Sequence, residues 1–328
     1  MKDAKIVTLS DIARRLNTSV NTVSRALRDC SDIGAETKRR VQKTADEMGY
    51  QPNRVASFMR SKISNIIAIF ISSLHNPFFS ICLNYIFNYL KDRDYYPLII
   101  VNKKGGLLVK DIIDCMQRGT GGILTFIDLE RDAVEYCDQN NIPLLLCGLQ
   151  PQDDRVSAIY SDDESCGKLI ARECFSKGCR KPCYINGSKG PLNTKRRYGF
   201  ECELQTKDIS CDNYYFDYTN ENASLRDIKK EILQNENDFI FCFNDEIAVS
   251  VFRLFEFSGE YVGRIYGVDG IAKYLPYLQR INSVGGNLKE VSERCCHVLL
   301  NKMKKGHKRI IREIFPVELI RAEGHSEL

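Results

Sequence analysis

The feature that most constrains the fold is a regular alternation that runs from Asn65 to Gly270. Short apolar runs recur along it, each followed by a segment with apolar residues at helical spacing. The runs are NIIAIFISS, YPLIIVN, GILTFI, IPLLLCG, PCYING, FIFCFND and RIYGVDG, and the helical segments are 77–93, 107–118, 164–177, 194–205, 221–235 and 246–258. This βαβα order predicts mostly parallel sheets covered by helices. The 265 residues after position 63 suit two such lobes with a cleft between them.

Polar residues follow several of these predicted strands. SSLHNPFF follows the first strand, YSDDESCG follows another, and FIFCFND and RIYGVDG carry Asp or Asn-Asp near their ends. Any one of them alone is consistent with a helix cap, and Pro77 suits the first position of a helix. Ligands of parallel α/β folds bind beyond the carboxyl ends of the strands, so the recurrence favours a shared cleft.

The N-terminus has a different pattern. Residues 8–29 are predicted to form two short helices joined by about three residues. Thr8 and Asp11 form a sequence like a capping box, and Ser19 is a second N-cap. A third helix is expected over 35–48, with Gly34 as its cap. The predicted inward-facing residues are Ile12, Ala13, Leu16, Val23, Ala26, Leu27, Val41, Ala45 and Met48.

Three small helices could form a purely structural bundle or a DNA-binding domain. The residues on the outward face of the second helix distinguish these two interpretations. This face carries Val20, Asn21, Thr22, Ser24, Arg25 and Arg28. Arg25 can bond a guanine bidentately and Asn21 an adenine, each worth roughly 1–3 kcal/mol of discrimination, and Val20 can touch a thymine methyl. Residues 1–62 carry 13 Lys and Arg against 7 Asp and Glu, whereas the rest carries 34 against 36. The basic excess therefore lies where a phosphate backbone would bind.

The stretches LSDIARRLNTSVNTVSRALRD and ETKRRVQKTADEMGYQPNRVASFMRS resemble the headpiece of the lactose-repressor (LacI/GalR) family of bacterial transcription regulators. The elements SVxTVSR and GYxPNxxA are specific to it. The resemblance implies dimers on operator DNA, with each second helix in a major groove. It places Ser19, Val20, Asn21, Thr22, Ser24 and Arg25 against DNA, and Leu9, Thr37 and Tyr50 at the phosphates.

The segment NRVASFMRSK, after Pro52, matches the family's hinge helix, which orders on the operator and inserts a leucine into the minor groove. Here Met59 takes that position, and a simple linker residue is the alternative reading. Asn53, Arg54 and Ala56 would lie beside it.

The remaining chain resembles the family's sensor domain, through NPFF, the Asp162 segment, TKRRYGF, FNDEIAV and YGVDG. The implied fold is an all-α helix-turn-helix headpiece plus an α/β two-lobed effector domain like the type I periplasmic binding proteins. Phe78 and Phe79 would form an aromatic wall, and Arg196 would bind hydroxyl or carboxylate groups. The other implied effector contacts are Asn244, Asp269, Asp162 and Ser73.

Some positions depart from the family pattern. Ser73 and Gly121 replace common aspartates, Gly270 replaces an acidic residue, and Gly286 replaces a glutamine. These differences leave the fold prediction unchanged. They leave the pocket open to an unusual sugar, a nucleoside or no small molecule.

Other classes of protein find little support in the sequence. GxGxxG, GxxxxGK[ST], HExxH and GxSxG are missing, and four scattered histidines fit a sensor better than an enzyme. The fourteen cysteines lack a CxxC pair, so free thiols are expected, with Cys147 and Cys242 as small buried apolar residues. No cofactor or metal is expected. The N-terminus lacks the apolar region of a secretory signal, which predicts a cytoplasmic, nucleoid-associated protein without membrane contact.

The sequence therefore predicts a homodimeric repressor of a palindromic operator, controlled by a small metabolite in the cleft, and the expected metabolite is a carbohydrate. The alternative is a regulator whose C-terminal domain serves dimerisation or protein docking without an effector. Expected boundaries are 1–50 for the headpiece, 51–63 for the hinge, and 64–328 for the effector domain. Its lobes are expected at 64–157 with 287–311, and at 158–286 with 312–328.

Overall fold

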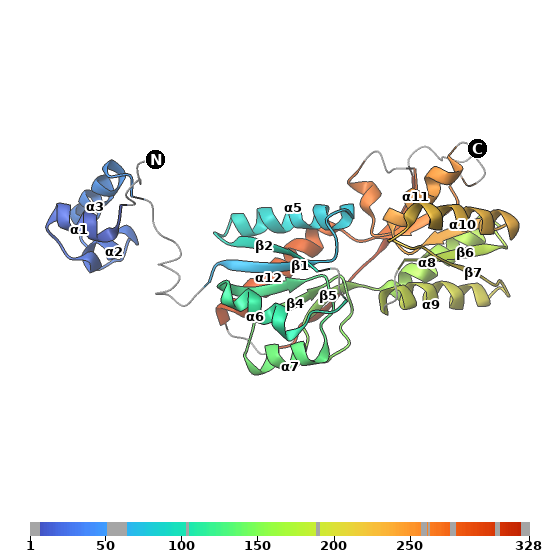
Figure 1. Ribbon diagram of the computed structural model, residues 1–328, viewed down its shortest axis with the longest axis horizontal. Coiled ribbons are helices and arrows are strands. Elements are labelled where there is room, and N and C mark those ends of the chain that lie inside the picture. The colour runs from blue at the N-terminus through green and yellow to red at the C-terminus, as the bar shows by residue number, and fades with distance from the viewer. Residues whose placement is uncertain are drawn as a thin grey trace. The chain divides into compact units, whose positions relative to one another are not determined.

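The computed structural model describes residues 7–50, 64–102, 105–187, 191–256, 261, 263–275, 280–305 and 309–322. The chain forms two compact units, Met1–Ile63 and Ser64–Leu328 (Figure 1). The predicted hinge residues Asn53, Arg54, Ala56 and Met59 lie outside the described residues. Among the described residues, no helix combines the length and apolar character that a membrane span requires.

The smaller unit contains three helices, α1 (Leu9–Leu16), α2 (Val20–Leu27) and α3 (Ala35–Glu47). The predicted caps are confirmed. Thr8 and Asp11 form a capping box, Asn17 ends α1 in a left-handed conformation, and Ser19 caps α2. The core consists of Ile12, Ala13, Val23, Ala26, Val41 and Ala45. The three-residue turn and the apolar stripes therefore produce the predicted helix-turn-helix.

The first lobe of the larger unit has a six-stranded parallel sheet in the order β11-β5-β4-β3-β1-β2. Its strands are β1 (Ile66–Ile71), β2 (Tyr96–Val101), β3 (Thr120–Thr125), β4 (Leu144–Cys147), β5 (Ala158–Ser161) and β11 (Arg312–Phe315). Helices α5 (Pro77–Lys91) and α12 (Leu288–Lys305) cover one face, and α6 (Val109–Gln117) and α7 (Arg131–Gln139) cover the other (Figure 1).

The second lobe repeats this plan, with the strand order β12-β10-β9-β8-β6-β7. Its strands are β6 (Pro182–Asn186), β7 (Asp212–Tyr215), β8 (Phe239–Cys242), β9 (Ile265–Val268), β10 (Asn282–Gly285) and the antiparallel β12 (Glu318–Ile320). Helices α8 (Asp163–Ser176) and α9 (Pro191–Gln205) pack on one face, and α10 (Glu221–Gln234) and α11 (Asp245–Phe255) pack on the other.

The chain passes between the lobes at residue 162, at 286–287 and at 316–317. The first sheet includes β5 and β11, whereas the sequence-based boundaries gave 158–161 and 312–315 to the second lobe. The difference arises because these two strands pair with each other in parallel. The lobes also touch through the short 3₁₀ helix η1 (Ile271–Lys273), since Ile271 and Ala272 pack into the core of the first lobe.

Candidate functional site

The exposed face of α2 carries the side chains predicted to read bases. Val23 and Ala26 are buried in the headpiece core, whereas Val20 is 41% exposed and Asn21 and Arg28 are exposed. Thr22, Ser24 and Arg25 are partly exposed. The Ser19 hydroxyl accepts a hydrogen bond from the Thr22 backbone N–H at 3.0 Å, and the two hydroxyl oxygens lie 2.8 Å apart. Ser19 therefore fixes the start of the helix whose first turn would meet the bases.

Both arginines of α2 are held by contacts within the headpiece. An ion pair joins the Arg25 guanidinium to the Asp32 carboxylate, and both side chains are more than 40% exposed. The Arg28 Nε–H donates to the Ser24 carbonyl at 3.1 Å. Because an exposed ion pair contributes only about 0–1 kcal/mol, DNA can displace Asp32 from Arg25 at low cost.

The residues expected at the phosphates occupy other parts of the headpiece. Leu9 and Tyr50 pack against its core, and Thr37 lies in the first turn of α3. Leu9 is the first residue of α1, and Tyr50 follows α3. Backbone N–H groups at helix N-termini are suitable donors to phosphate oxygens, which fits the positions of Leu9 and Thr37.

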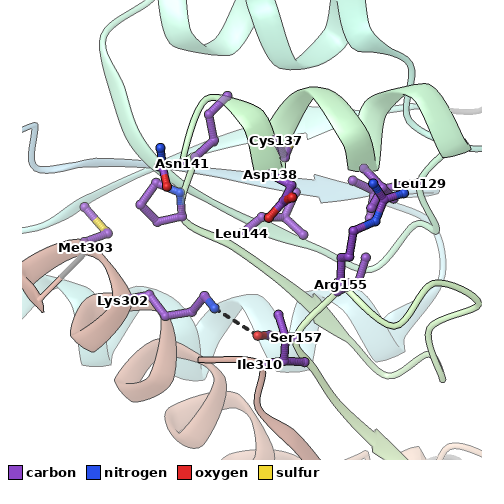
Figure 2. Close-up of a pocket in the computed structure, with 14 residues that line it drawn as sticks. Leu129, Cys137, Asp138, Asn141, Leu144, Arg155, Ser157, Lys302, Met303 and Ile310 are labelled. Carbon is purple, nitrogen blue, oxygen red and sulfur yellow. Dashed lines mark hydrogen bonds between the residues drawn. The ribbon is translucent and has the colours of Figure 1, made fainter. Parts of the chain in front are cut away.

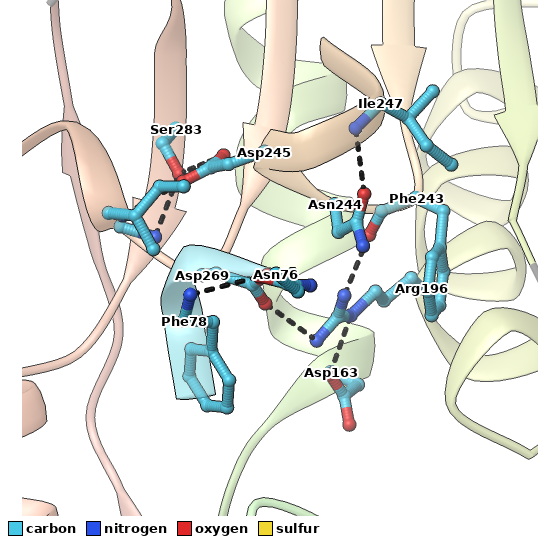
Figure 3. Close-up of polar contacts among 12 residues, drawn as sticks. Asn76, Phe78, Asp163, Arg196, Phe243, Asn244, Asp245, Ile247, Asp269 and Ser283 are labelled. Atoms are coloured by element: carbon cyan, nitrogen blue, oxygen red, sulfur yellow. Dashed lines mark hydrogen bonds and ion pairs between the residues drawn. The ribbon is translucent and has the colours of Figure 1, made fainter. Parts of the chain in front are cut away.

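In the larger unit, Arg196 of α9 lies at the centre of a buried polar cluster (Figure 3). Its Nε donates to Asp163 Oδ1 at 2.9 Å, and its Nη1 donates to the Phe243 carbonyl at 2.7 Å. Its Nη2 lies 3.7 Å from Asp269 Oδ1, and the Phe243 ring centroid lies 5.0 Å from its guanidinium carbon. The bonds to Asp163 and Phe243 therefore fix the orientation of the guanidinium group, with its Nη2 directed toward Asp269.

Two glycines determine where Arg196 lies. A Cβ added at Gly199 would be 2.1 Å from the Glu164 carbonyl oxygen, and one added at Gly167 would be 2.2 Å from the Arg196 carbonyl oxygen. Helices α8 and α9 therefore cross with their backbones in contact, which only glycine permits. This crossing brings Asp163, the first residue of α8, within bonding distance of Arg196.

Asp269 follows β9 and has a buried carboxyl group. Burial raises its pKa to about 7, and the charges of Asp163 and Glu246 act in the same direction, while Arg196 opposes them. Its backbone has a φ of +121°, an uncommon conformation for a residue with a side chain. The next residue, Gly270, has a φ of +69°. The pair therefore makes a tight turn that directs Asp269 toward Arg196.

The neighbouring Asp245 serves the structure of the second lobe. Its carboxylate accepts hydrogen bonds from the Ser283 hydroxyl at 2.7 Å and from the Ile271 N–H at 2.9 Å. It is fully buried, and this burial raises its pKa, as does the charge of Asp269. Asp245 thereby ties α11 to β10 and to the start of η1.

The first lobe contributes the N-terminus of α5. The Asn76 Oδ1 accepts from the Phe78 N–H at 2.9 Å and so caps the helix. Figure 3 shows Asn76 and Phe78 next to Asp269. The rings of Phe78, Phe79 and Phe126 form a T-shaped cluster with centroid distances of 5.4 to 6.1 Å. An apolar wall thus stands beside the Arg196–Asp269 pair.

The other predicted effector contacts have local roles. Asp162 caps α8 through the Ser165 N–H at 3.0 Å, and Asn244 caps α11 through the Ile247 N–H at 3.0 Å. The Asn244 amide also donates to the Tyr218 hydroxyl at 3.4 Å. The Ser73 hydroxyl accepts from the His75 N–H at 3.0 Å. These contacts leave Arg196, Asp269 and Phe78 as the predicted residues that the structure brings together.

Sequence reasoning missed Asp163, Asn76 and Phe126 as members of this site. Asp163 stands next to the predicted Asp162, and only the register of α8 decides which of the two meets Arg196. Phe126 directly follows β3, at the strand end where polar residues were sought. An aromatic residue at the end of a strand indicates the lining of a ligand pocket as well as a polar residue does.

Two departures from the family pattern have steric explanations. A Cβ at Gly121 would lie 2.7 Å from the Ser64 carbonyl oxygen and 2.8 Å from the Met303 Cε. A Cβ at Gly270 would lie 2.9 Å from the Ile320 Cδ1, at a left-handed backbone position. Neither position has room for an acidic side chain here.

Together, a capped helix-turn-helix and a two-lobed α/β unit define the class of protein: a helix-turn-helix regulator with a periplasmic-binding-protein-like domain. Residues 8–53 match the model described as "Bacterial regulatory proteins, lacI family". The headpiece therefore contains a lacI-family DNA-binding domain, and the similarities together support a LacI/GalR-family transcriptional regulator. The predicted family and the predicted fold class are thus confirmed.

Relatives in sequence include the HTH-type transcriptional repressor PurR of Aliivibrio salmonicida (strain LFI1238). It is 23% identical over 333 residues, covering 98% of this chain and 100% of the relative. The sucrose operon repressor of Pediococcus pentosaceus is 23% identical over 321 residues, covering 95% and 98%. The chain thus aligns with DNA-binding repressors over nearly its whole length.

Solved structures show the same fold. The lac repressor dimer bound to operator and the anti-inducer ONPF has a TM-score of 0.81 at 20% identity, covering 97% of this chain and 98% of that one. A LacI-family regulator from Enterococcus faecium with bound ribose has a TM-score of 0.68 at 19% identity, covering 78% and 97%. The complex of the regulator CelR with cellobiose has a TM-score of 0.65 at 18% identity, covering 97% and 100%.

Proposed function

We propose that this protein is a homodimeric repressor that binds an inverted-repeat operator and responds to an uncharged polyhydroxy metabolite, such as a sugar. The observation that carries the DNA-binding part is the exposed face of α2, with Asn21, Arg25 and Arg28 outside and Val23 and Ala26 in the core. Asn21 and Arg25 would contact base edges, with Val20 at a thymine methyl. Such a protein performs no chemical reaction and acts on the chromosome, in the cytoplasm.

An apolar sheet edge supports the dimer. Strand β2 is the last strand of the first sheet, and its Tyr96, Ile99 and Val101 are 39–46% exposed. Phe87 of the neighbouring α5 is half exposed as well. An exposed apolar edge strand favours association, and a second copy of the chain covers it in this proposal. Two headpieces then bind two half-sites related by symmetry, which makes the operator an inverted repeat.

The charges around Arg196 support an uncharged ligand. Asp163 and Asp269 both lie at the guanidinium, so two carboxylates face one cation and an anionic ligand would be repelled. The 3.7 Å separation of Nη2 and Oδ1 is too long for a hydrogen bond. A ligand hydroxyl can insert there, donating to Asp269 and accepting from Arg196, while Phe78 contacts the apolar face of the ring. The sugars named with the structural neighbours, ribose and cellobiose, have this chemistry.

The ligand would control DNA binding through the relative arrangement of the two lobes. It can shift an equilibrium only by its difference in affinity for two states. A coupling free energy of roughly 1–3 kcal/mol changes operator affinity about 5–150-fold. Because η1 already packs into the core of the first lobe, any movement of the lobes must rearrange Ile271 and Ala272.

Selection from random duplex DNA tests the proposal. Wild-type protein is expected to recover an inverted repeat, and Arg25→Ala should lose base preference at one position in each half-site and about 1–3 kcal/mol of operator affinity. Arg14→Ala, which removes the same charge from α1, is the control and should keep the preference. If no inverted repeat were recovered, the proposal that the protein binds its operator as a dimer would be contradicted.

A thermal-shift screen with sugars and nucleosides tests the effector. Stabilisation by a sugar that Asp269→Ala abolishes is expected. The alternative, a dimerisation or docking domain without an effector, is favoured by the absence of an aspartate at Ser73 and of a glutamine at Gly286. That alternative predicts stabilisation by none of the compounds.

A further inference from the structure

A cavity of about 190 Å³ lies within the first lobe and shares no lining residue with the Arg196 cluster. Figure 2 shows it between α7 and the end of α12, next to the start of β4. Most of its wall is apolar, including Val134, Cys137, Leu144, Met303 and Ile310. It is slightly larger than an engineered cavity of about 150 Å³ that binds benzene, so its size suits one aromatic ring.

Lys302 brings a positive charge to this apolar wall. Its Nζ donates to the Ser157 hydroxyl at 2.9 Å and to the Arg309 carbonyl at 3.3 Å, both of them neutral acceptors. Burial lowers the pKa of the ammonium group. Within the described part of the chain, no carboxylate lies within ion-pair distance of Lys302. An ammonium group has three N–H donors, so one remains for a ligand.

Ser157 offers a second donor at the same point. Its side-chain oxygen accepts from Lys302 Nζ and from the Ile311 N–H at 3.1 Å, and the residue is only 2% exposed. With both lone pairs engaged, the hydroxyl proton is left to donate, and the described residues provide no acceptor for it. A buried hydroxyl and a half-buried ammonium thus lie together, and each has one donor for which the described residues provide no acceptor.

The charged groups at the rim form a network around Arg155. Arg155 donates to Asp153 through Nε at 3.0 Å and through Nη2 at 2.7 Å, and it also interacts with Asp138 and Glu135. Asp138 is exposed at the opening. Arg155 thus faces three carboxylates, and this network at the solvent boundary is net negative, whereas Lys302 is the positive group at the cavity wall beside Ser157.

We propose that this cavity is a binding site for a small aromatic or branched aliphatic monocarboxylate. The carboxylate would accept hydrogen bonds from Lys302 and Ser157, and the apolar body would lie against Val134, Leu144 and Met303. A carboxylate is an acceptor with two oxygens, which matches two donors and no acceptor. The site is independent of the sugar site.

The cavity is connected through packing contacts to the start of the larger unit. Met303 lines the cavity and also packs closely against Gly121 and Gly122 of β3. Gly121 in turn lies against Ser64, where the larger unit begins after the linker. A ligand that fixes Met303 therefore stabilises the strand end at which the chain enters this unit.

Calorimetric titration of the full chain with sodium benzoate tests the proposal, with benzyl alcohol as the neutral analogue and acetate as the anion without a ring. Benzoate should bind at least tenfold more tightly than either, because a charge-assisted hydrogen bond contributes about 1.5–3 kcal/mol. Lys302→Met should lose that advantage, and so should Lys302→Gln, which keeps an N–H donor but removes the charge. Lys304→Met, an exposed position on the same helix, should retain it.

Three outcomes would overturn the site: no binding of benzoate, equal binding by the Lys302 variants, or equal binding of benzyl alcohol. The Arg196 site has no spare cation, so a benzoate signal that depends on Lys302 belongs to this cavity. None of these results bears on the proposed sugar, which is tested separately through Asp269.

Discussion

Arg25 of the headpiece and Arg196 of the larger unit are both arginines bound to aspartate, but they lie in opposite environments. Arg25 is partly exposed and forms an ion pair with Asp32 at the surface. Arg196 is buried and bonded to Asp163 and the Phe243 carbonyl, with Asp269 nearby. A screened contact exchanges easily for a DNA phosphate or base, whereas a buried guanidinium with fixed partners is already oriented for a ligand. The first suits reversible docking, and the second suits selective recognition.

Removal of Arg196 is expected to have the largest effect on stability. Arg196→Ala leaves Asp163 and Asp269 buried without their cation, which should lower the free energy of unfolding by about 3–5 kcal/mol. Arg25→Ala should lower it by less than about 1 kcal/mol, because its pair is exposed. Urea unfolding of both variants measures this contrast.

Arg197→Ala is the matched control for Arg196→Ala. Arg197 is the next residue and pairs with Glu201 at 3.8 Å on the helix surface. It should behave like Arg25→Ala. If Arg196→Ala and Arg197→Ala lowered the free energy of unfolding equally, the proposed difference between a buried and an exposed arginine would be contradicted.

A pH effect of intermediate size is expected from Asp269. Its pKa in the folded protein is about 7, above the value near 4 of an unfolded chain, so the folded state holds the proton more tightly between these values. The stability contributed by this proton is present at low pH and is lost as the pH rises toward 7, by roughly 1.4 kcal/mol per unit at most.

Asp269→Asn cannot titrate at this position and should therefore gain stability relative to wild type as the pH rises from about 5 to 7. Thermal or urea unfolding across this range measures the difference. A constant difference between the two proteins would show that Asp269 does not titrate there.

The parts of the fold that could be predicted from the sequence are those with local causes. The caps at Thr8 and Ser19 depend on side chains next to the backbone groups that they satisfy, and the apolar runs predicted β1–β4, β6, β8 and β9. Strands β7, β10, β11 and β12 were not predicted, because polar or charged residues interrupt them. Helix α12 was not predicted, because its apolar residues are interrupted by charged ones, and its burial against α5 and β3 is a tertiary effect.

The candidate site divides in the same way. The family resemblance identified Arg196 and Asp269 by their motifs, whereas Asp163 depends on the glycine contact between α8 and α9. The Arg25–Asp32 pair was missed because Asp32 lies beyond the end of α2, where only the three-dimensional path of the loop brings it back. Contacts across a turn or between crossing helices leave no periodic pattern in the sequence, so the sequence does not predict them.

The smallest expected effect concerns Asp32. Asp32→Asn releases Arg25 and removes a negative charge from the headpiece, so operator affinity should rise by about 0.2–1 kcal/mol, or roughly 1.4–5-fold. Asp46→Asn removes the same charge from α3, where Asp46 bonds Gln42 rather than Arg25. Fluorescence anisotropy on the selected operator should show a larger gain for Asp32→Asn, and equal gains would mean that general charge explains the effect.

Arg25 is proposed to read DNA and Arg196 to mediate the metabolite response, and one measurement tests both roles. Operator affinity is determined by anisotropy, with and without the stabilising sugar, for wild type, Arg25→Ala and Arg196→Lys. Arg25→Ala should bind the operator more weakly yet respond to the sugar by the wild-type factor, and Arg196→Lys should keep its basal affinity and lose the response. A full response in Arg196→Lys, or unchanged operator affinity in Arg25→Ala, would contradict the account.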